Sequence, residues 1–218
     1  MTNQLIDIPV NDISLIGELS LIPDSKGLII FSHGSGSSRV SPRNRYIAHK
    51  LNDVRFSTLL FDLLTPYEDQ TRASRFDIDL LSERLQKVTE WLKEDFKFRN
   101  MSFGYFGAST GAASAIRAAI VLGEDIVQAV VSRGGRPDMA FNYLNELECP
   151  VLLLVGEKDA KVLELNQKAY EVLSSSKKIS LIPRATHLFE KIGTLEQVAE
   201  EATEWFQQYL LQPTTQLE

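Results

Sequence analysis

The spacing of apolar positions changes along this chain, and that change predicts alternating strands and helices. Two segments at the start, residues 5–10 and 13–22, read as strands joined by a tight turn at Asn11 and Asp12, which predicts an opening β-hairpin. Six compact apolar runs follow, each suited to a strand buried on both faces of a sheet. These runs occupy residues 28–31, 56–61, 101–106, 126–131, 151–155 and 179–182.

Between these runs, apolar residues recur every three or four positions, which is typical of helices with one buried face. The clearest case extends from Ile78 to Leu92, and Asp77 is suited to be its N-cap. Further helices are expected at residues 44–51, 110–122, 161–173 and 195–210. Strands that alternate with helices call for right-handed crossovers and a mostly parallel sheet, so the fold class is α/β.

Length and composition favour one globular domain. The chain has 218 residues, of which 44% are hydrophobic and 24% charged, and no repeat, low-complexity tract or linker interrupts the pattern. We therefore expect a single domain over residues 1–216. The last two residues, Leu217 and Glu218, have the character of a vector-derived tail that is not part of the fold.

Charge and cysteine content narrow the function classes. The formal net charge of −6 argues against a nucleic-acid-binding surface, and the longest apolar runs are too short to span a bilayer. The single cysteine, Cys149, has no partner for an internal disulfide, and no basic segment leads into an apolar signal stretch. A cytoplasmic protein without nucleic-acid or membrane partners is expected.

The segment Gly107-Ala108-Ser109-Thr110-Gly111 matches Gly-x-Ser-x-Gly. It follows an apolar run and opens a helix of small residues, the setting in which this motif exposes a nucleophilic serine. The sharp reversal holds Ser109 in a strained conformation, beside N–H groups of a helix N-terminus that favour a developing oxyanion. Ser109 is the predicted nucleophile, and the alternative is a glycine-rich turn with an ordinary serine.

A serine hydroxyl needs a neighbouring base, and the chain has three histidines. His187 lies in a loop after the last predicted strand, from which it can reach Ser109, and it is the predicted base. His49 is expected to point to solvent from a helix, and His33 to support the loop after the first central strand. Taken alone, His187 could equally be a loop histidine of no consequence.

An acid that orients the histidine is expected after a strand, in the chain order Ser, Asp, His. Asp159 fits this order, and its strand leads directly to the one that carries His187, so it is the favoured acid. Asp138 is the rival, with a cap or first-turn position in a helix as its structural alternative. Glu157 is a weaker third candidate.

The loop after the first central strand reads His33-Gly34-Ser35-Gly36. Its glycines allow the backbone to approach a tetrahedral intermediate, so the backbone N–H groups of Ser35 and Thr110 are the predicted oxyanion donors. The alternative is a flexible Gly/Ser turn. No Lys-Ser/Thr ending follows this loop, which argues against a phosphate-binding P-loop.

These segments, together with Gly156 to Asp159 and Thr186-His187, resemble the α/β-hydrolase fold, and within it the dienelactone-hydrolase-like family. The resemblance covers nearly the whole chain from about Gly27. It implies a mostly parallel central sheet with an N-terminal antiparallel hairpin and helices on both faces. Dienelactone hydrolases proper carry a cysteine nucleophile, whereas this chain has Ser109, which places it in a serine branch and makes general ester hydrolysis the expectation.

The resemblance also bears on domain content. Many α/β hydrolases insert a cap domain after the sixth strand, but only residues 132–148 separate the two corresponding strands here. An open site without a cap domain is therefore expected. Some relatives are joined to phosphoribosyltransferase domains, and none is expected in these residues.

Substrate contacts are predicted at the carboxyl ends of two further strands. Tyr67 lies in the loop over residues 63–76 and is expected to form a wall of the site. Arg133 and Arg136 could pair with a substrate carboxylate, which predicts a preference for small acidic esters. Their alternative roles are those of surface or structural arginines.

The sequence thus predicts a serine hydrolase that cleaves a carboxylic ester of a small molecule through an acyl-enzyme, as a monomer or homodimer and without metal or cofactor. Ser109, His187 and Asp159 form the predicted triad. The alternatives are a thioesterase or peptidase with the same triad, and a non-catalytic member of the fold that binds a small molecule or a protein.

Overall fold

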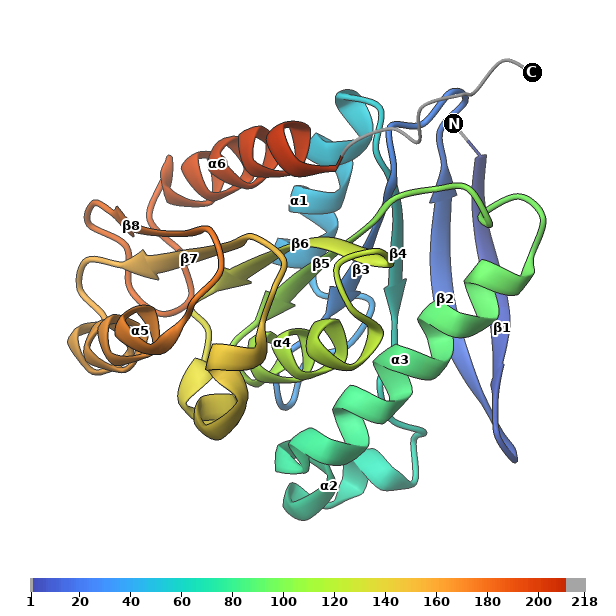
Figure 1. Cartoon of the computed structure of the whole chain (residues 1–218), viewed down its shortest axis with the longest axis horizontal. Coiled ribbons are helices and arrows are strands. Elements are labelled where there is room, and N and C mark those ends of the chain that lie inside the picture. Colours follow the sequence, from blue (N-terminus) through green and yellow to red (C-terminus); the bar gives the residue numbers. More distant parts are fainter. Residues whose placement is uncertain (1, 211–218) are drawn as a thin grey trace.

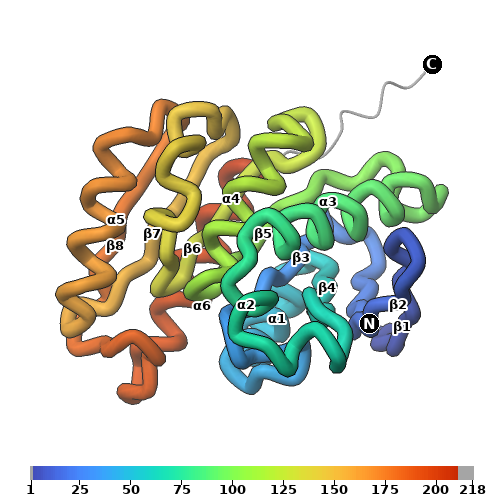
Figure 2. The backbone as a smooth tube through the Cα atoms, turned by 90° about the horizontal axis from the view of Figure 1, so that it is seen from below, coloured from blue at the N-terminus to red at the C-terminus, as the bar shows by residue number. Residues whose placement is uncertain are grey.

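The computed structural model describes residues 2–210, which form one eight-stranded sheet with helices on both faces (Figure 1). The strand order is β1-β2-β4-β3-β5-β6-β7-β8, and Figure 2 shows the strands in this order from one side of the molecule to the other. The pairings of β1 with β2 and of β2 with β4 are antiparallel, and all others are parallel. Leu217 and Glu218, interpreted above as a tail, lie outside the described residues.

The strands are β1 (Thr2–Val10), β2 (Ile13–Leu21), β3 (Leu28–Ser32), β4 (Ser57–Phe61), β5 (Phe103–Ala108), β6 (Val127–Arg133), β7 (Val151–Gly156) and β8 (Lys177–Ile182). The α-helices are α1 (Pro42–Asp53), α2 (Arg72–Phe76), α3 (Ile78–Glu94), α4 (Thr110–Leu122), α5 (Ala160–Val172) and α6 (Thr194–Tyr209). Two 3-10 segments complete the described elements, η1 (Glu68–Gln70) and η2 (Pro137–Glu146).

The N-terminal hairpin forms as predicted. Asn11 turns the chain with a positive φ of 50°, a conformation that Asn tolerates better than most residues, and Val10 pairs with Ile13 across the turn. The antiparallel pairing of β2 with β4 then joins the hairpin to the parallel part of the sheet.

Two apolar cores lie on opposite faces of the sheet. Helices α1 and α6 cover one face, where Ile47, Leu51 and Phe206 pack against Ile29 and Phe31. Helices α3, α4 and α5 cover the other face (Figure 1). Burial of each such large apolar side chain contributes about 1.5–3 kcal/mol to folding, so the central strands form a firm platform for their terminal loops.

The prediction that all six apolar runs are buried on both faces is wrong for β8. Strands β3, β4, β5 and β7 are buried throughout, but β8 is the edge strand and the helices cover it only in part, so Leu181 is 45% exposed. The stretch over residues 63–76, treated above as a loop, contains η1 and α2. These helices are short and lack the long apolar periodicity that reveals helices such as α3.

The parallel strands β3 to β8 end at one edge of the sheet, where ligands bind in open α/β sheets. The loops that begin at Ser109, Gly134 and Pro183 therefore gather there, with those that begin at residues 33, 62 and 157. Only residues 134–150 separate β6 from β7. They include η2, which is kinked at Ala140. No cap domain is inserted at this place in the described chain.

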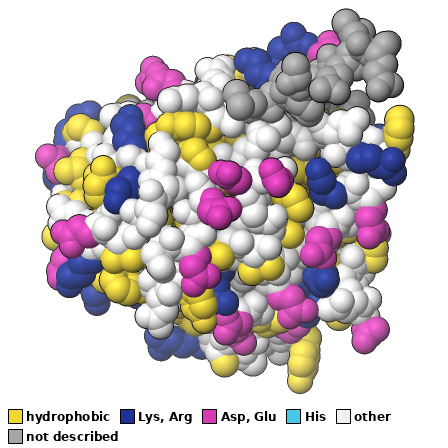
Figure 3. Space-filling view, viewed as in Figure 1, with side chains coloured by type: hydrophobic (Ala, Val, Ile, Leu, Met, Phe, Trp, Pro, Cys, Tyr) yellow, Lys and Arg dark blue, Asp and Glu magenta, His cyan; other side chains and the backbone are white. Residues whose placement is uncertain are grey.

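On the face shown in Figure 3, acidic and basic side chains are interspersed. Within residues 2–210, no helix has the length and apolar character needed to cross a membrane.

Candidate active site

The central residue of the predicted elbow lies between β5 and α4 in a strained conformation. Ser109 has a φ of 52° and a ψ of −121°, outside the regions that residues with a Cβ normally adopt, at a cost of roughly 1–3 kcal/mol. Two hydrogen bonds from the end of β6 and the segment after it hold it there. The Ser109 N–H donates to the Arg133 carbonyl at 3.2 Å, and the Arg136 N–H donates to the Ser109 carbonyl at 3.0 Å.

The two glycines of the elbow are required by close packing. A Cβ on Gly107 would come within 2.5 Å of the Ala112 Cα, and a Cβ on Gly111 would collide with the Ser32 carbonyl oxygen. Helix α4 can therefore start directly against β3 and β5, which fixes the place of Ser109 at the sheet edge.

The structure brings His187 and Asp159 together. Asp159 occupies the N-cap position of α5, but its side chain makes no cap hydrogen bond. Its Oδ2 instead lies 2.7 Å from Nδ1 of His187. Because an ionised carboxylate only accepts hydrogen bonds, Nδ1 carries the proton and Nε2 is left as the basic nitrogen.

The other two candidate acids are bound elsewhere. Asp138 pairs with Arg136 through two hydrogen bonds, of 2.8 and 2.7 Å. The Glu157 carboxylate accepts a 2.7 Å hydrogen bond from the Arg184 N–H. Asp159 is therefore the one of the three that contacts His187.

Ser109 and His187 both lie against the residues that follow β6. Gly134 follows Arg133, which binds the Ser109 N–H, and a Cβ on Gly134 would lie 3.5 Å from Cε1 of the His187 ring. No hydrogen bond joins the Ser109 hydroxyl to His187 among the described residues. Catalytic hydrogen bonds are often long in ligand-free enzymes and tighten when the substrate binds.

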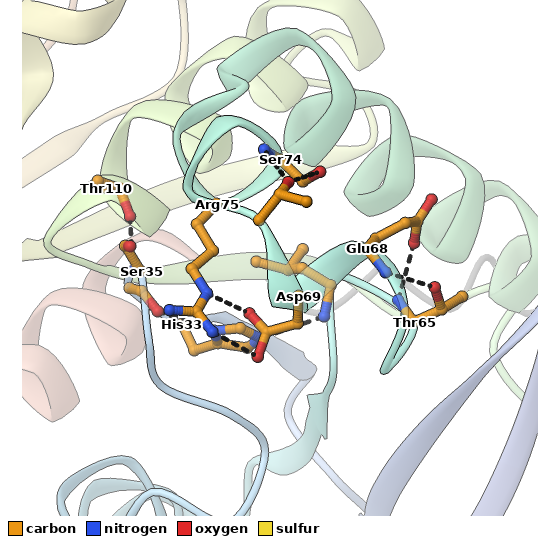
Figure 4. Close-up of polar contacts among 11 residues, drawn as sticks. His33, Ser35, Thr65, Glu68, Asp69, Ser74, Arg75 and Thr110 are labelled. Atoms are coloured by element: carbon orange, nitrogen blue, oxygen red, sulfur yellow. Dashed lines mark hydrogen bonds and ion pairs between the residues drawn. The ribbon is translucent and has the colours of Figure 1, made fainter.

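The loop after β3 passes beside Ser109. A Cβ on Gly34 would lie 3.0 Å from the Ser109 Cβ, so only a glycine lets the loop come this close. The Ser35 N–H, a predicted oxyanion donor, donates to Oγ1 of Thr110 at 2.8 Å (Figure 4). The Thr110 N–H lies in the first turn of α4, where backbone N–H groups have no intrahelical acceptor.

His33 supports this loop from within. Its Nε2 accepts a hydrogen bond from the Leu63 N–H at 3.1 Å, so Nδ1 carries the proton and donates to the Gly34 carbonyl at 3.0 Å. Burial lowers the pKa of His33 below 6.5, which favours this neutral form. Asp69, in η1, forms an ion pair with Arg75, in α2, and Figure 4 shows this pair next to His33. His49 is exposed, as expected.

The three residues predicted to contact the substrate, Arg133, Arg136 and Tyr67, differ from one another in burial and in partners. Arg133 is 9% exposed at the end of β6, whereas Arg136 is held by Asp138 and is not free to bind a ligand. Tyr67 is 82% exposed, and its side chain makes no hydrogen bond or ring contact within the described chain.

The single cysteine of the chain, Cys149, is buried. Burial raises the pKa of the Cys149 thiol to about 12, so it remains protonated and unreactive. Within residues 2–210, no group of three or more His, Cys, Asp or Glu side chains is arranged to hold a metal ion.

A strained serine at a strand-to-helix turn, followed along the chain by an aspartate and a histidine in contact, is the arrangement of the α/β-hydrolase fold. The chain belongs to the dienelactone hydrolase family of this fold. It is 46% identical to the dienelactone hydrolase of Anabaena variabilis, with a TM-score of 0.92 over 95% of this chain and 98% of that one. The protein is therefore a member of a hydrolase family.

More distant structures share the fold. Est1E from Butyrivibrio proteoclasticus is 17% identical, with a TM-score of 0.80 over 94% of this chain and 98% of that one. No family model matches the chain.

The curated relatives are longer. Proteins from two strains of Mycobacterium tuberculosis, each named "Putative phosphoribosyl transferase", are 47% identical over 213 residues, or 98% of this chain and 48% of theirs. The chain thus spans about half the length of the curated relatives it matches.

Proposed function

We propose that this protein is a serine esterase that hydrolyses a carboxylic ester of a small molecule through an acyl-enzyme. The observation that carries the proposal is the contact between His187 and Asp159, because it leaves Nε2 as a base beside the segment that also holds the strained Ser109. Family membership supports hydrolysis, and the Ser-His-Asp set supports the acyl-enzyme route.

In the proposed reaction, the Ser109 oxygen attacks the ester carbonyl while Nε2 of His187 accepts the hydroxyl proton. The tetrahedral intermediate collapses, its bond to the leaving oxygen breaks, and His187 delivers the proton to the departing alcohol. Water then attacks the acyl-enzyme, His187 takes a proton from the water, and this proton returns to Ser109 as the acid leaves. Asp159 stays ionised and stabilises the imidazolium in both steps.

The backbone N–H of Thr110 is the first proposed oxyanion donor, because it lies directly after the nucleophile at a helix N-terminus. The Ser35 N–H is the second, from the loop that Gly34 brings against Ser109. Ser35 must share its hydrogen between the Thr110 hydroxyl and the substrate oxygen, or exchange one for the other, since it already donates to Thr110. Tyr67 is proposed as an outer wall of the site.

A thioesterase or peptidase would use the same three residues, and a binding protein would keep the scaffold without turnover. The name of the curated relatives indicates transfer of a phosphoribosyl group. We do not propose that activity for this chain, because the Ser-His-Asp set performs acyl transfer. A cytoplasmic location and a monomeric or homodimeric state remain predictions from the sequence.

The test combines labelling with turnover. A fluorophosphonate should add its mass to Ser109, and hydrolysis of 4-nitrophenyl butyrate should fall to background in Ser109→Ala. Ser176→Ala, which removes a hydroxyl bound to Tyr209 rather than one at the elbow, serves as the matched control and should retain both properties. Wild-type protein that is neither labelled nor active toward esters, thioesters and amides would favour the non-catalytic alternative.

A further inference from the structure

A buried positive charge without an acidic partner lies beside the proposed site. Arg133 is 9% exposed, and its Nη1 is buried with no hydrogen-bond partner within residues 2–210. The contact that the structure gives its guanidinium is with the Phe189 ring, 6.0 Å from its centroid. Burial of an unpaired charge is costly, so arginines this deep in a protein are normally bound to an anion.

The charge of a second guanidinium, that of Arg43, acts on Arg133. Arg43, in the first turn of α1, has a buried Nε without a partner. Burial and the charge of Arg43 together lower the pKa of Arg133 to about 10. Four acidic side chains from the strands and loops at this end of the sheet are each bound to another basic group: Glu18 to Arg45, Asp62 to Arg39, Asp138 to Arg136 and Asp159 to His187.

The two arginines come from segments that border the nucleophile. Arg133 precedes Gly134, where a Cβ would lie 3.5 Å from Cε1 of the His187 ring, and the Arg133 carbonyl accepts a hydrogen bond from the Ser109 N–H. Arg43 follows Ser41, the N-cap that ends the loop after β3. A group held by both guanidiniums would therefore belong to a molecule that also reaches Ser109.

We propose that Arg133 and Arg43 form an anion-binding subsite that holds a phosphate-like dianion on the ester substrate. This inference deepens the proposed function and rests on it. Neither guanidinium forms an ion pair within residues 2–210, so together they present two positive charges, which a phosphate monoester neutralises and a single carboxylate does not. The planar guanidinium also matches phosphate oxygens through paired hydrogen bonds.

Three 4-nitrophenyl esters with acyl groups of similar length test the charge preference. The butyrate ester is neutral, and the succinate half-ester carries one negative charge. The 3-phosphonopropionate ester carries two negative charges at a pH above the second pKa of its phosphonate. We expect kcat/KM to be highest for the phosphonate ester. Its ratio to the butyrate value should fall about ten- to a hundredfold in Arg133→Met and in Arg43→Gln, the loss typical of a hydrogen bond to a charged group.

Arg117→Gln is the matched control. Arg117 pairs with Asp79 and stacks on Tyr143, away from the elbow, so its loss should leave the ratio unchanged. An unchanged ratio in both Arg133→Met and Arg43→Gln would overturn the subsite. A higher kcat/KM for succinate than for phosphonate would overturn its assignment to a dianion.

A measurement without turnover separates this inference from the esterase proposal. Inorganic phosphate should bind Ser109→Ala protein in calorimetry and raise its Tm, and both effects should be lost when Arg133→Met is added. Without phosphate, Arg133→Met should raise the Tm, because it replaces an uncompensated buried charge by an apolar side chain of similar length. A lower Tm with unchanged phosphate binding would instead give Arg133 a structural role. Phosphate binding by a protein that cleaves no ester would leave the subsite standing and refute the esterase.

Discussion

Nδ1 of His187 lies 2.7 Å from Oδ2 of Asp159, and this contact joins the loops after β7 and β8. The same loops are also joined through their backbones, since the Lys158 N–H donates to the Ala185 carbonyl at 2.9 Å. Gly156 makes this approach possible, because a Cβ there would lie 2.6 Å from the Ala185 carbonyl oxygen. The orientation of the imidazole is therefore fixed by backbone packing as well as by the carboxylate.

Replacement of this carboxylate should separate its electrostatic role from its structural one. In Asp159→Asn the side chain keeps its size but can donate to Nδ1, which favours the wrong histidine tautomer. We expect kcat for 4-nitrophenyl butyrate to fall about 10³- to 10⁴-fold, the range known for this change in a Ser-His-Asp protease. Asp138→Asn breaks only the pair with Arg136 and should lower kcat less than about fivefold. Equal losses in the two variants would remove Asp159 from the triad.

Thr110 provides a second test, because its hydroxyl anchors the loop that supplies the other proposed oxyanion donor. Thr110→Val removes the acceptor of the Ser35 N–H while keeping the shape of the side chain, and the loop loses a hydrogen bond worth about 1 kcal/mol. We expect kcat to fall about five- to tenfold, with little change in KM. Thr110→Ser keeps the hydroxyl and should retain activity near that of wild type. If valine and serine behave alike, the anchor has no part in catalysis.

Gly34 provides a third test that depends on space rather than on charge. In Gly34→Ala the new methyl group would lie 3.0 Å from both the Ser109 Cβ and the Ala108 carbonyl oxygen, so the loop must retreat from the nucleophile. Oxyanion donors act only at short range, so we expect kcat/KM to fall at least about tenfold. Gly123→Ala is the control, since it strains a positive φ at the end of α4 without meeting other atoms and should affect only the Tm. Full activity in Gly34→Ala would argue against an oxyanion role for this loop.

Much of the fold was predictable because its signals are local. The apolar period of three to four residues identified α3, and Gly-x-Ser-x-Gly placed Ser109 at the start of α4. The predicted boundaries were less accurate at the carboxyl ends of the strands. Strand β6 extends to Arg133, two residues beyond the predicted end. The apolar run stops at Val131, but Ser132 and Arg133 still pair with both β5 and β7. Backbone hydrogen bonds, which the hydrophobic pattern does not report, decide where such a strand ends.

The candidate site could be predicted from the order of Ser, Asp and His along the chain, but not from contacts that form only on folding. Order and strand position led to His187 and Asp159, whereas the pairing of Arg136 with Asp138 depends on a turn before η2 whose geometry no spacing reveals. Arg43 was missed because a basic residue in the first turn of a helix has the sequence signature of a solvent-facing charge. Its proposed role depends on the effect of its charge on Arg133, which lies ninety positions further along the chain and comes within range only in the folded sheet.

His33 provides the last test, through the pH dependence of stability. Burial lowers its pKa in the folded protein below the value of 6.5 expected in the unfolded chain. Between these two pKa values the unfolded chain binds a proton that the folded protein does not. The stability that neutral His33 supports is therefore complete above pH 6.5 and is lost as the pH falls, with a slope of at most about 1.4 kcal/mol per pH unit.

Urea unfolding at a series of pH values between 7.5 and 5 measures this slope. The free energy of unfolding of wild type should fall with acid more steeply than that of His33→Gln, which has no ring to protonate. His49→Gln removes an exposed histidine and should follow the wild-type slope. Protonated Nε2 can no longer accept from the Leu63 N–H, so the loop beside Ser109 should loosen only at a pH below the lowered pKa of folded His33. Parallel curves for wild type and His33→Gln would show that the pKa of His33 is the same in the folded and unfolded chain, and that acid acts through other groups.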